Sequence, residues 1–131
     1  MNKKIFFLAA ALLYQGTVFA EDVCVSPVSN ADLLNCAEKE KEAAEKLINQ
    51  EYIAAKKRVS NAYEASPKLS QDYLKTLLDS QRAWLKYRDN QCKLEAYLAE
   101  EGTSANKMLV SKCVARLDKE RASQLQAMPY Q

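Results

Sequence analysis

Paired carboxylates are plentiful in this sequence. One group consists of Glu38, Glu42 and Glu45, and a second consists of Glu100 and Glu101. Paired carboxylates act as general acid and base only in a cleft whose surroundings separate their pKa values. The first group is interleaved with lysines at helical spacing, which is typical of a solvated helix face with ion pairs. We therefore interpret both groups as surface residues rather than a hydrolytic pair.

Nucleophilic catalysis has no complete set of residues in this chain. The sequence contains no His that could act as a base, and its Cys are expected to be oxidised, which leaves no thiolate. Ser111 and Lys112 are neighbours on a predicted helix, so their side chains face different directions. No Gly-rich phosphate loop is present. The sequence predicts a protein that is not an enzyme and uses no cofactor.

The cysteines predict two disulfides in an oxidising compartment, since they accompany an export signal. They are Cys24, Cys36, Cys92 and Cys113. Metal binding is the rival chemistry, but zinc sites use His or a Cys-x-x-Cys pair, and neither occurs here. We predict no metal site.

One stretch, residues 81–92, concentrates the aromatic and polar residues of the chain. It holds the only Trp, and Trp84, Leu85, Arg88 and Cys92 recur at three- and four-residue steps, so they share one face of a helix. We interpret Trp84 as a core anchor, Arg88 as a paired structural cation and Cys92 as half of a disulfide.

The same stretch carries a resemblance to a known family. Read as Gln-Arg-Ala-Trp-Leu-x-Tyr-Arg-Asp-x-x-Cys, it resembles the signature of the lysozyme inhibitor LprI-like (YecT-like) family, N-terminal-domain type. Further similar pieces follow the family order: Asn35-Cys36-Ala37, Gly102-Thr103-Ser104, Cys113 and residues 117–125. The sequence departs from the pattern twice, because Thr103 replaces a second Gly and Asp118 stands where a Thr is usual. The resemblance implies a periplasmic or secreted inhibitor of lysozyme or a similar peptidoglycan hydrolase.

Residues 1–20 have the pattern of a secretory signal peptide. Lys3 and Lys4 precede an apolar run over residues 5–13, and Val18-Phe19-Ala20 ends the segment with small residues at the required spacing. The run is shorter than the roughly 20 residues of a membrane span. We predict cleavage after Ala20 and a soluble periplasmic or secreted product that no longer contacts the membrane.

Removal of that segment makes the chain neutral. The sequence has 19 Lys and Arg against 17 Asp and Glu, and loss of Lys3 and Lys4 leaves 17 of each. A neutral domain is a poor ligand for nucleic acid, where phosphate neutralisation dominates affinity. The one dense basic run, Lys56-Lys57-Arg58, is expected to be a solvated helix end.

Residues 21–131 are predicted to form a single all-α domain. Alternation with a period of two is absent, and helical spacing is interrupted only at Pro27, Ser66-Pro67 and Gly102-Thr103-Ser104. We expect one long helix capped by Ser29, a second starting near Ser70, and a third capped by Ser104 and ended by Pro129. Short connections then predict an antiparallel helical hairpin within an up-down-up three-helix bundle, stapled by two disulfides.

This arrangement favours one disulfide scheme. Cys92 lies ten residues before Gly102 and Cys113 lies eleven after it, so an antiparallel pair brings them side by side. Cys24 precedes the first helix and Cys36 falls in its second turn, which favours a Cys24–Cys36 bond. A scheme that joins Cys24 to Cys113 and Cys36 to Cys92 remains open.

Four charged residues can link the second and third helices. An Arg88–Glu120 or an Asp89–Arg121 bridge would fix the register of the two helices. The functional alternative is that Arg88 or Arg121 projects from the domain to bind a carboxylate of a partner protein.

Two surfaces are candidates for partner binding. The loop over residues 100–107 offers Ser104 and Lys107 as donors to a cleft carboxylate, and the predicted Cys92–Cys113 bond braces it. The rival is the Lys86, Arg88 and Asp89 face of the second helix. Two other functions stay open: an envelope scaffold or protein-interaction module that uses the long first helix, and an immunity protein against a secreted toxin.

Overall fold

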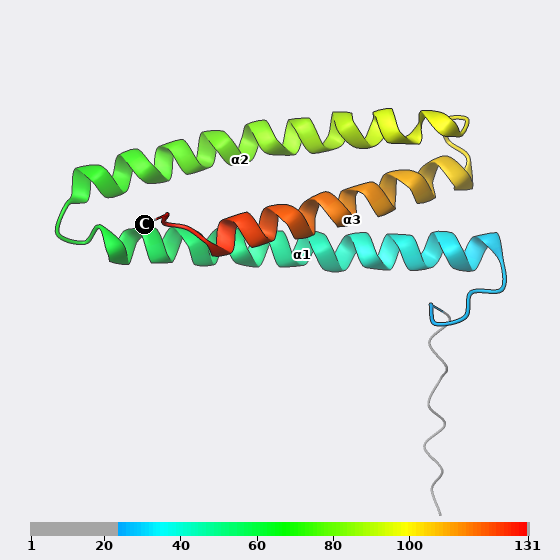
Figure 1. Cartoon of the computed structure of the whole chain (residues 1–131), viewed down its shortest axis with the longest axis horizontal. Helices are drawn as coiled ribbons and strands as arrows, with labels where there is room; N and C mark the ends of the chain where they lie inside the picture. The colour runs from blue at the N-terminus through cyan, green and yellow to red at the C-terminus, as the bar shows by residue number, and fades with distance from the viewer. Residues whose placement is uncertain (1–23, 131) are drawn as a thin grey trace, which may run out of the picture.

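Three long α-helices and one short 3-10 helix make up the described structure. The computed structural model describes residues 24–130, and the predicted signal peptide lies outside them. The elements are α1 (Asn30–Ala62), α2 (Pro67–Glu95), η1 (Ala96–Leu98) and α3 (Ser104–Gln126). The helices run up, down and up, and no strand occurs between residues 24 and 130 (Figure 1). The all-α prediction is confirmed.

The helix starts follow local chemistry. Ser29 caps α1 as predicted: its hydroxyl accepts the N–H of Asp32 at 3.1 Å, and the Asp32 carboxylate accepts the N–H of Ser29 at 3.0 Å. α2 begins at Pro67 rather than near Ser70, because proline's fixed φ and missing N–H suit the first position of a helix. The cap of α3 is Thr103, not Ser104.

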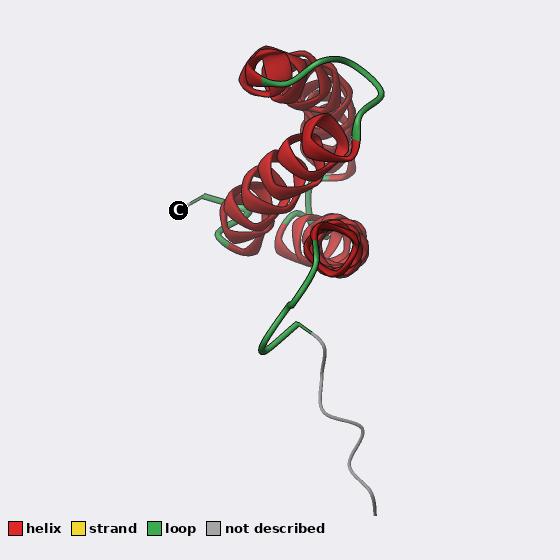
Figure 2. Cartoon of the chain, turned by 90° about the vertical axis from the view of Figure 1, so that its right-hand side faces the viewer, coloured by secondary structure: helices red, strands yellow, loops and turns green. Residues whose placement is uncertain are grey.

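The closest helix packing joins α1 to α3. Figures 1 and 2 show α3 starting beside the end of α2 and crossing onto α1, so that α1 and α2 contact each other least. Alanines form much of the buried face on both packed helices: Ala37, Ala44 and Ala55 on α1, with Ala115 and Ala122 on α3. Small side chains let helix axes approach closely. The hairpin of long helices is present, but its two helices are separated over much of their length by α3.

The core consists of two clusters that Trp84 joins. The first contains the buried residues Ile48, Ala55, Leu77, Leu125 and Met128, and the second contains Cys92, Cys113, Val114 and Leu117. Trp84 packs against both clusters, which agrees with its predicted role as an anchor. Leu85, predicted on the same face as Trp84, is 36% exposed, and Leu78 of α2 is 37% exposed. Both leucines lie at the border between the buried and exposed faces of α2, because α3 covers only a narrow face of that helix.

Both favoured disulfides are formed. Cys92 joins Cys113 between α2 and α3, and Cys24 joins Cys36 between the segment before α1 and its second turn. The Cα atoms are 5.4 Å apart in each bond. The alternative scheme is therefore wrong for this structure.

Arg58 has a structural role that the sequence did not indicate. Its Nη2 donates to the carbonyl of Leu125 at 2.8 Å and its Nε to the carbonyl of Met128 at 2.9 Å. These carbonyls lie in the last turn of α3 and just beyond it, where backbone acceptors lack helical donors. The expected solvated helix end is wrong for Arg58, because this half-buried cation of α1 caps α3 instead.

Candidate functional site

Arg88 lies between α2 and α3 and is tied to two carboxylates. Its side chain is 13% exposed, its Nη1 donates to Asp118 at 3.0 Å, and its Nε and Nη2 donate to Asp89 at 2.9 and 2.7 Å. The guanidinium also sits 5.7 Å from the centre of the Trp84 ring. The predicted Arg88–Glu120 bridge is wrong. On a helix, side chains two positions apart point in directions that differ by about 200°. Asp118 therefore faces α2, and Glu120 points to solvent.

Asp118 is the most deeply buried charged group among the described residues. Its side chain is 0% exposed, and its Oδ2 has no hydrogen-bond partner in residues 24–130. Burial raises the pKa of Asp118, and the nearby carboxylates of Glu45 and Asp89 add to that effect while Arg88 opposes it. The same contacts with Asp89 and Asp118 outweigh burial and raise the pKa of Arg88.

Arg121 is buried and bonded on all sides of its guanidinium. Nε donates to Gln81 at 3.1 Å, Nη2 to Ser80 at 3.1 Å and Nη1 to Gln124 at 2.9 Å. Burial lowers the pKa of Arg121. The predicted Asp89–Arg121 bridge is wrong, because Arg121 faces α2 two helical turns before Asp89. The network still links α2 to α3, so it fixes register through neutral acceptors.

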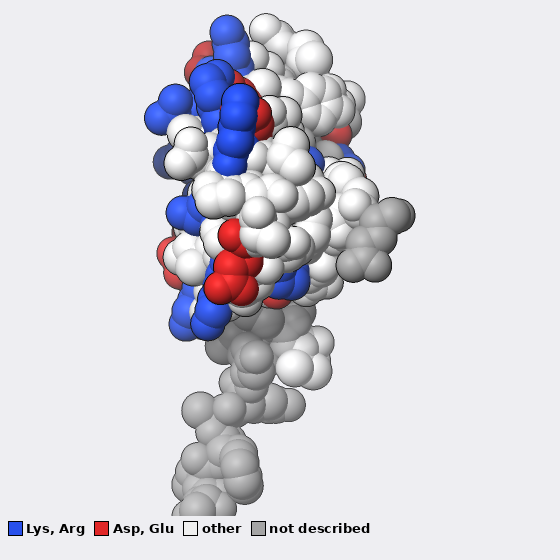
Figure 3. All heavy atoms as spheres, turned by 90° about the vertical axis from the view of Figure 1, so that its left-hand side faces the viewer, with Lys and Arg blue, Asp and Glu red and all other residues white. Residues whose placement is uncertain are grey.

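Lys86 belongs to a line of cations on the outer face of α2. Steps of seven, seven, four and seven residues separate the five members, which are Lys68, Lys75, Arg82, Lys86 and Lys93. Such steps place them on one side of the helix, opposite the buried face. Viewed from the end where α1 turns into α2, Lys and Arg gather along one edge of the molecule (Figure 3). Lys68 and Lys75 pair with aspartates, whereas Lys86 forms no ion pair within residues 24–130.

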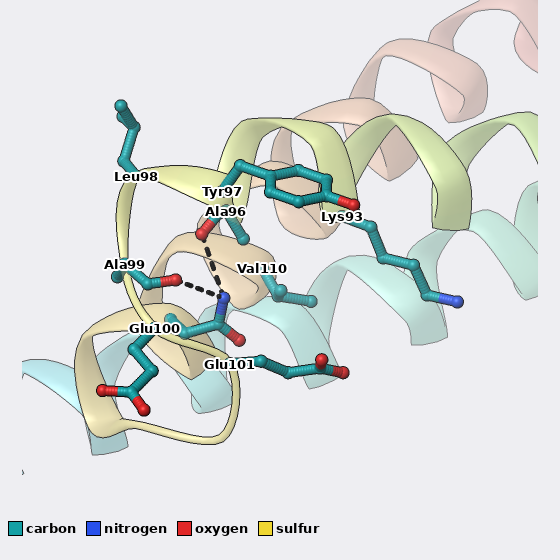
Figure 4. A pocket seen from close by; sticks show the side chains of 9 residues that line it. Lys93, Ala96, Tyr97, Leu98, Ala99, Glu100, Glu101 and Val110 are labelled. Carbon is teal, nitrogen blue, oxygen red and sulfur yellow. Dashed lines mark hydrogen bonds between the residues drawn. The ribbon is translucent and has the colours of Figure 1, made fainter.

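The loop before α3 is exposed and is tied to its neighbours by hydrogen bonds. Gly102 has φ +82°, a left-handed conformation that favours glycine, and Thr103 caps the helix that follows. Ser104 and Lys107 lie in the first turns of α3 and are exposed. The Asn106 side chain donates to the carbonyls of Ala96 at 3.0 Å and Ala99 at 3.3 Å (Figure 4). Of the predicted partner-binding residues, Ser104, Lys107 and Lys86 are exposed and form no ion pair within residues 24–130. Arg88 and Arg121 are occupied by contacts within the domain, and the half-exposed Asp89 accepts from Arg88.

Three exposed apolar residues stand next to this loop, and the helical pattern of the sequence did not indicate them. Leu94, Tyr97 and Leu98 are 62%, 81% and 88% exposed. Tyr97 and Leu98 line a hollow of about 360 Å³, whose lining also includes Lys93, Glu100, Glu101 and Asn106. Their position in the sequence could have indicated this exposure. They stand just before the loop and do not share the helix face of Trp84, Arg88 and Cys92.

Metal and membrane sites are not evident in the described part of the chain. Between residues 24 and 130, no group of His, Cys, Asp or Glu is arranged to hold a metal ion. In the same residues no helix has both the length and the apolar character that spanning a membrane requires.

These features define a class of protein: a small three-helix domain, braced by two disulfides, whose buried polar groups join helices and whose exposed turn is held by hydrogen bonds. The chain belongs to the lysozyme inhibitor LprI family, since the model of that family matches residues 24–125. It is 36% identical over 115 residues to an uncharacterised protein of Rhizobium meliloti (strain 1021), covering 82% of this chain and 79% of that protein.

A solved structure shows the same fold. The crystal structure of a DUF1311 family protein from Pseudomonas putida KT2440 superposes with a TM-score of 0.70 at 22% sequence identity. The superposition covers 79% of this chain and 96% of the other. The three-helix arrangement therefore occurs in a chain with little sequence similarity.

Proposed function

We propose that this chain is exported and inhibits lysozyme or a related peptidoglycan hydrolase by binding it. The observation that carries the proposal is the match to an inhibitor family over residues 24–125, nearly all of the described domain. The signal-like pattern of residues 1–20 and the two disulfides suit an exported protein.

The loop over residues 100–107 is the better candidate for the inhibitory element. A lysozyme cleft presents two catalytic carboxylates, and the exposed Ser104 and Lys107 offer a hydroxyl and an ammonium to such a group. The loop is short and braced by the Cys92–Cys113 bond, so little conformational entropy is lost on binding. On the rival helix face, Arg88 already donates to Asp89 and Asp118.

The first alternative, a scaffold that uses the long helix, lacks the surface it needs. Along the whole of α1, Ile53 is the one large apolar side chain that is exposed. A helix that packs lengthwise on a partner requires a continuous apolar stripe. The structure offers α1 no such stripe.

A residual-activity assay tests the proposal. Chicken-type lysozyme would be mixed with protein purified from the periplasm of an expressing bacterium, then with Ser104→Ala/Lys107→Ala and Lys86→Ala variants of checked helicity. We expect inhibition by the parent, at least tenfold weaker inhibition by the loop variant, and little change with Lys86→Ala. Absence of inhibition of lysozyme and of other peptidoglycan hydrolases at micromolar excess would reject the function. Loss with Lys86→Ala alone would move the site to α2.

A further inference from the structure

A groove at the end where α1 turns into α2 has the composition of a small-molecule site. It has a volume of about 510 Å³ and lies at the opposite end of the bundle from the loop over residues 100–107 (Figure 1). Ligand pockets are concave and mostly apolar, with a few polar groups that orient the ligand. Most side chains that line this groove are aromatic or aliphatic: Tyr63, Leu69, Tyr73, Leu77, Met128 and Tyr130.

The apolar lining combines buried and exposed side chains. Leu77 and Met128 belong to the hydrophobic core, whereas Leu69 and Tyr130 are 56% and 61% exposed. An apolar body placed in the groove would cover these exposed side chains, which removes apolar surface from water. Figure 3 looks onto this end of the molecule, where uncharged side chains lie beside the edge that carries Lys and Arg.

The groove also contains the hydroxyl of Ser80, and a buried guanidinium stands behind it. Arg121 is 7% exposed, and its Nη2 donates to the Ser80 oxygen at 3.1 Å. Because this oxygen accepts, the Ser80 proton can be donated to an acceptor in the groove. A ligand oxygen about 2.7 Å from the Ser80 oxygen lies within roughly 6 Å of Nη2, close enough for opposite charges to attract.

Arg121 carries a buried charge that no carboxylate of residues 24–130 neutralises. The acceptors of its three hydrogen bonds are two side-chain amides and one hydroxyl, all of them neutral. Burial lowers the pKa of Arg121, and the phenol of Tyr130 is the one group whose charge raises it. Arg88, by contrast, bonds two carboxylates. Since buried charges are normally paired, Arg121 favours an anion in the groove.

The other charges near the groove do not reverse this preference. Asp72 is the one charged residue of the lining, and its carboxylate is already paired with Lys68 at 2.6 Å. Glu64 follows Tyr63 in the turn but does not line the groove. The three tyrosine hydroxyls of the lining form no hydrogen bond within residues 24–130, so they can donate to a ligand as Ser80 can.

We propose that this groove binds a small amphipathic carboxylate, with the apolar chain against the tyrosines and leucines, the carboxylate on Ser80, and Arg121 as the counter-charge. An aliphatic acid suits the groove better than a peptide, because the carboxylate that could accept amide protons is already paired. The inference is independent of the proposed function, since the site lies far from the loop assigned to hydrolase binding (Figure 1).

Three probes of equal chain length test the ligand class. Decanoate, decanol and decylammonium, each below its micelle concentration, would be titrated by calorimetry into protein purified from the periplasm of an expressing bacterium. We expect saturable binding of decanoate, at least about tenfold tighter than that of the other two probes, because only decanoate pairs with the guanidinium. Absence of saturable decanoate binding, or equal affinity for decylammonium, would overturn the proposal.

Ser80→Asp supplies the missing carboxylate from within the chain. Its side chain would pair with Arg121 in the place of the ligand's carboxylate, so the affinity for decanoate should fall by about tenfold or more. Ser80→Asn, a neutral variant of the same size, is the control and should keep the preference for decanoate. Both changes are at an exposed residue, and circular dichroism would verify the fold. Unchanged decanoate affinity in Ser80→Asp would contradict the role of Arg121.

A second pair of variants locates the apolar contact. Leu69→Ser/Tyr130→Ser removes the exposed part of the lining and should weaken decanoate binding by about tenfold or more. Tyr97→Ser/Leu98→Ser is the matched control, since these exposed residues lie at the other end of the molecule, and it should bind as the parent does. Equal losses in both variants would show that decanoate binds elsewhere. Dimerisation in ultracentrifugation that Leu69→Ser/Tyr130→Ser abolishes, or tighter binding of a peptide ending in Phe, would assign the groove to another occupant.

Discussion

Asp118 is a charged residue placed inside the bundle. Its carboxylate is 0% exposed, and one of its oxygens has no partner in the described structure. Arg88 compensates for that burial from α2 and is itself held by Asp89. A buried carboxylate with a single cation partner is seldom a large net gain in stability. Its clearest effect is to make stability depend on pH.

Asp118→Asn is expected to remove part of that pH dependence. Burial raises the folded pKa of Asp118 above its ordinary 3.8, so the native state binds this proton at higher pH than the unfolded chain. Between those two pKa values the free energy of unfolding falls as pH rises, by at most about 1.4 kcal/mol per pH unit. The stabilisation that protonated Asp118 contributes is therefore complete below the ordinary pKa of the unfolded chain, and it is lost above the raised pKa of the folded protein.

Urea unfolding between about pH 4 and 7 would check the sign. The parent should gain stability over Asp118→Asn on acidification. Asn61→Ala, a change at an exposed residue that does not titrate, should gain as much as the parent, because it keeps Asp118. A difference between parent and Asp118→Asn that stays constant with pH would contradict the argument.

At the scale of helices, the sequence predicts where helices begin and end, but it does not predict how they are oriented relative to one another. The Ser29 cap, the breaks at residues 63–66 and 99–103, and the symmetric position of Cys92 and Cys113 about the turn all follow from sequence spacing. The partners of Arg88 and Arg121 cannot be read from spacing, because they depend on how α3 is rotated about its own axis. One rotation directs Glu120 at Arg88, and another directs Asp118 at it. The close approach of α3 to α1 depends on alanines whose pairing only the folded chain reveals.

Arg58→Met tests the cap that joins α1 to the end of α3. The substitution keeps the aliphatic stem but removes two charge-assisted bonds, to the carbonyls of Leu125 and Met128. Hydrogen bonds of this kind contribute about 1.5–3 kcal/mol, so a loss of about 1–3 kcal/mol is expected after partial solvent exposure. Urea denaturation would measure it. Lys57→Met, at the exposed neighbour, serves as control, and equal stabilities for the two variants would show that the cap contributes nothing.

In the whole molecule, α1 and α3 form a closely packed pair, and α2 is attached to this pair by fewer contacts. α1 and α3 share the most extensive interface, while α2 is held by Trp84 and Leu77 in the core, by the Arg88 and Arg121 networks, and by the Cys92–Cys113 bond. Regions with fewer contacts open at lower free energy than the global unfolding reaction. The bond to Cys113 therefore limits how far α2 can separate from the pair.

Cys92→Ser/Cys113→Ser is accordingly expected to loosen α2 selectively. A disulfide that closes a loop with a sequence separation of 21 stabilises by about 3 kcal/mol through the unfolded state. Its loss lowers global stability by that order and also removes the tether of α2. Native-state hydrogen exchange should then show amides of Pro67–Glu95 exchanging faster relative to those of Asn30–Ala62 and Ser104–Gln126. Cys24→Ser/Cys36→Ser is the control, since that bond clips only the segment before α1. Equal acceleration in all three helices would show that the bundle opens as one unit and that α2 is no weaker than the others.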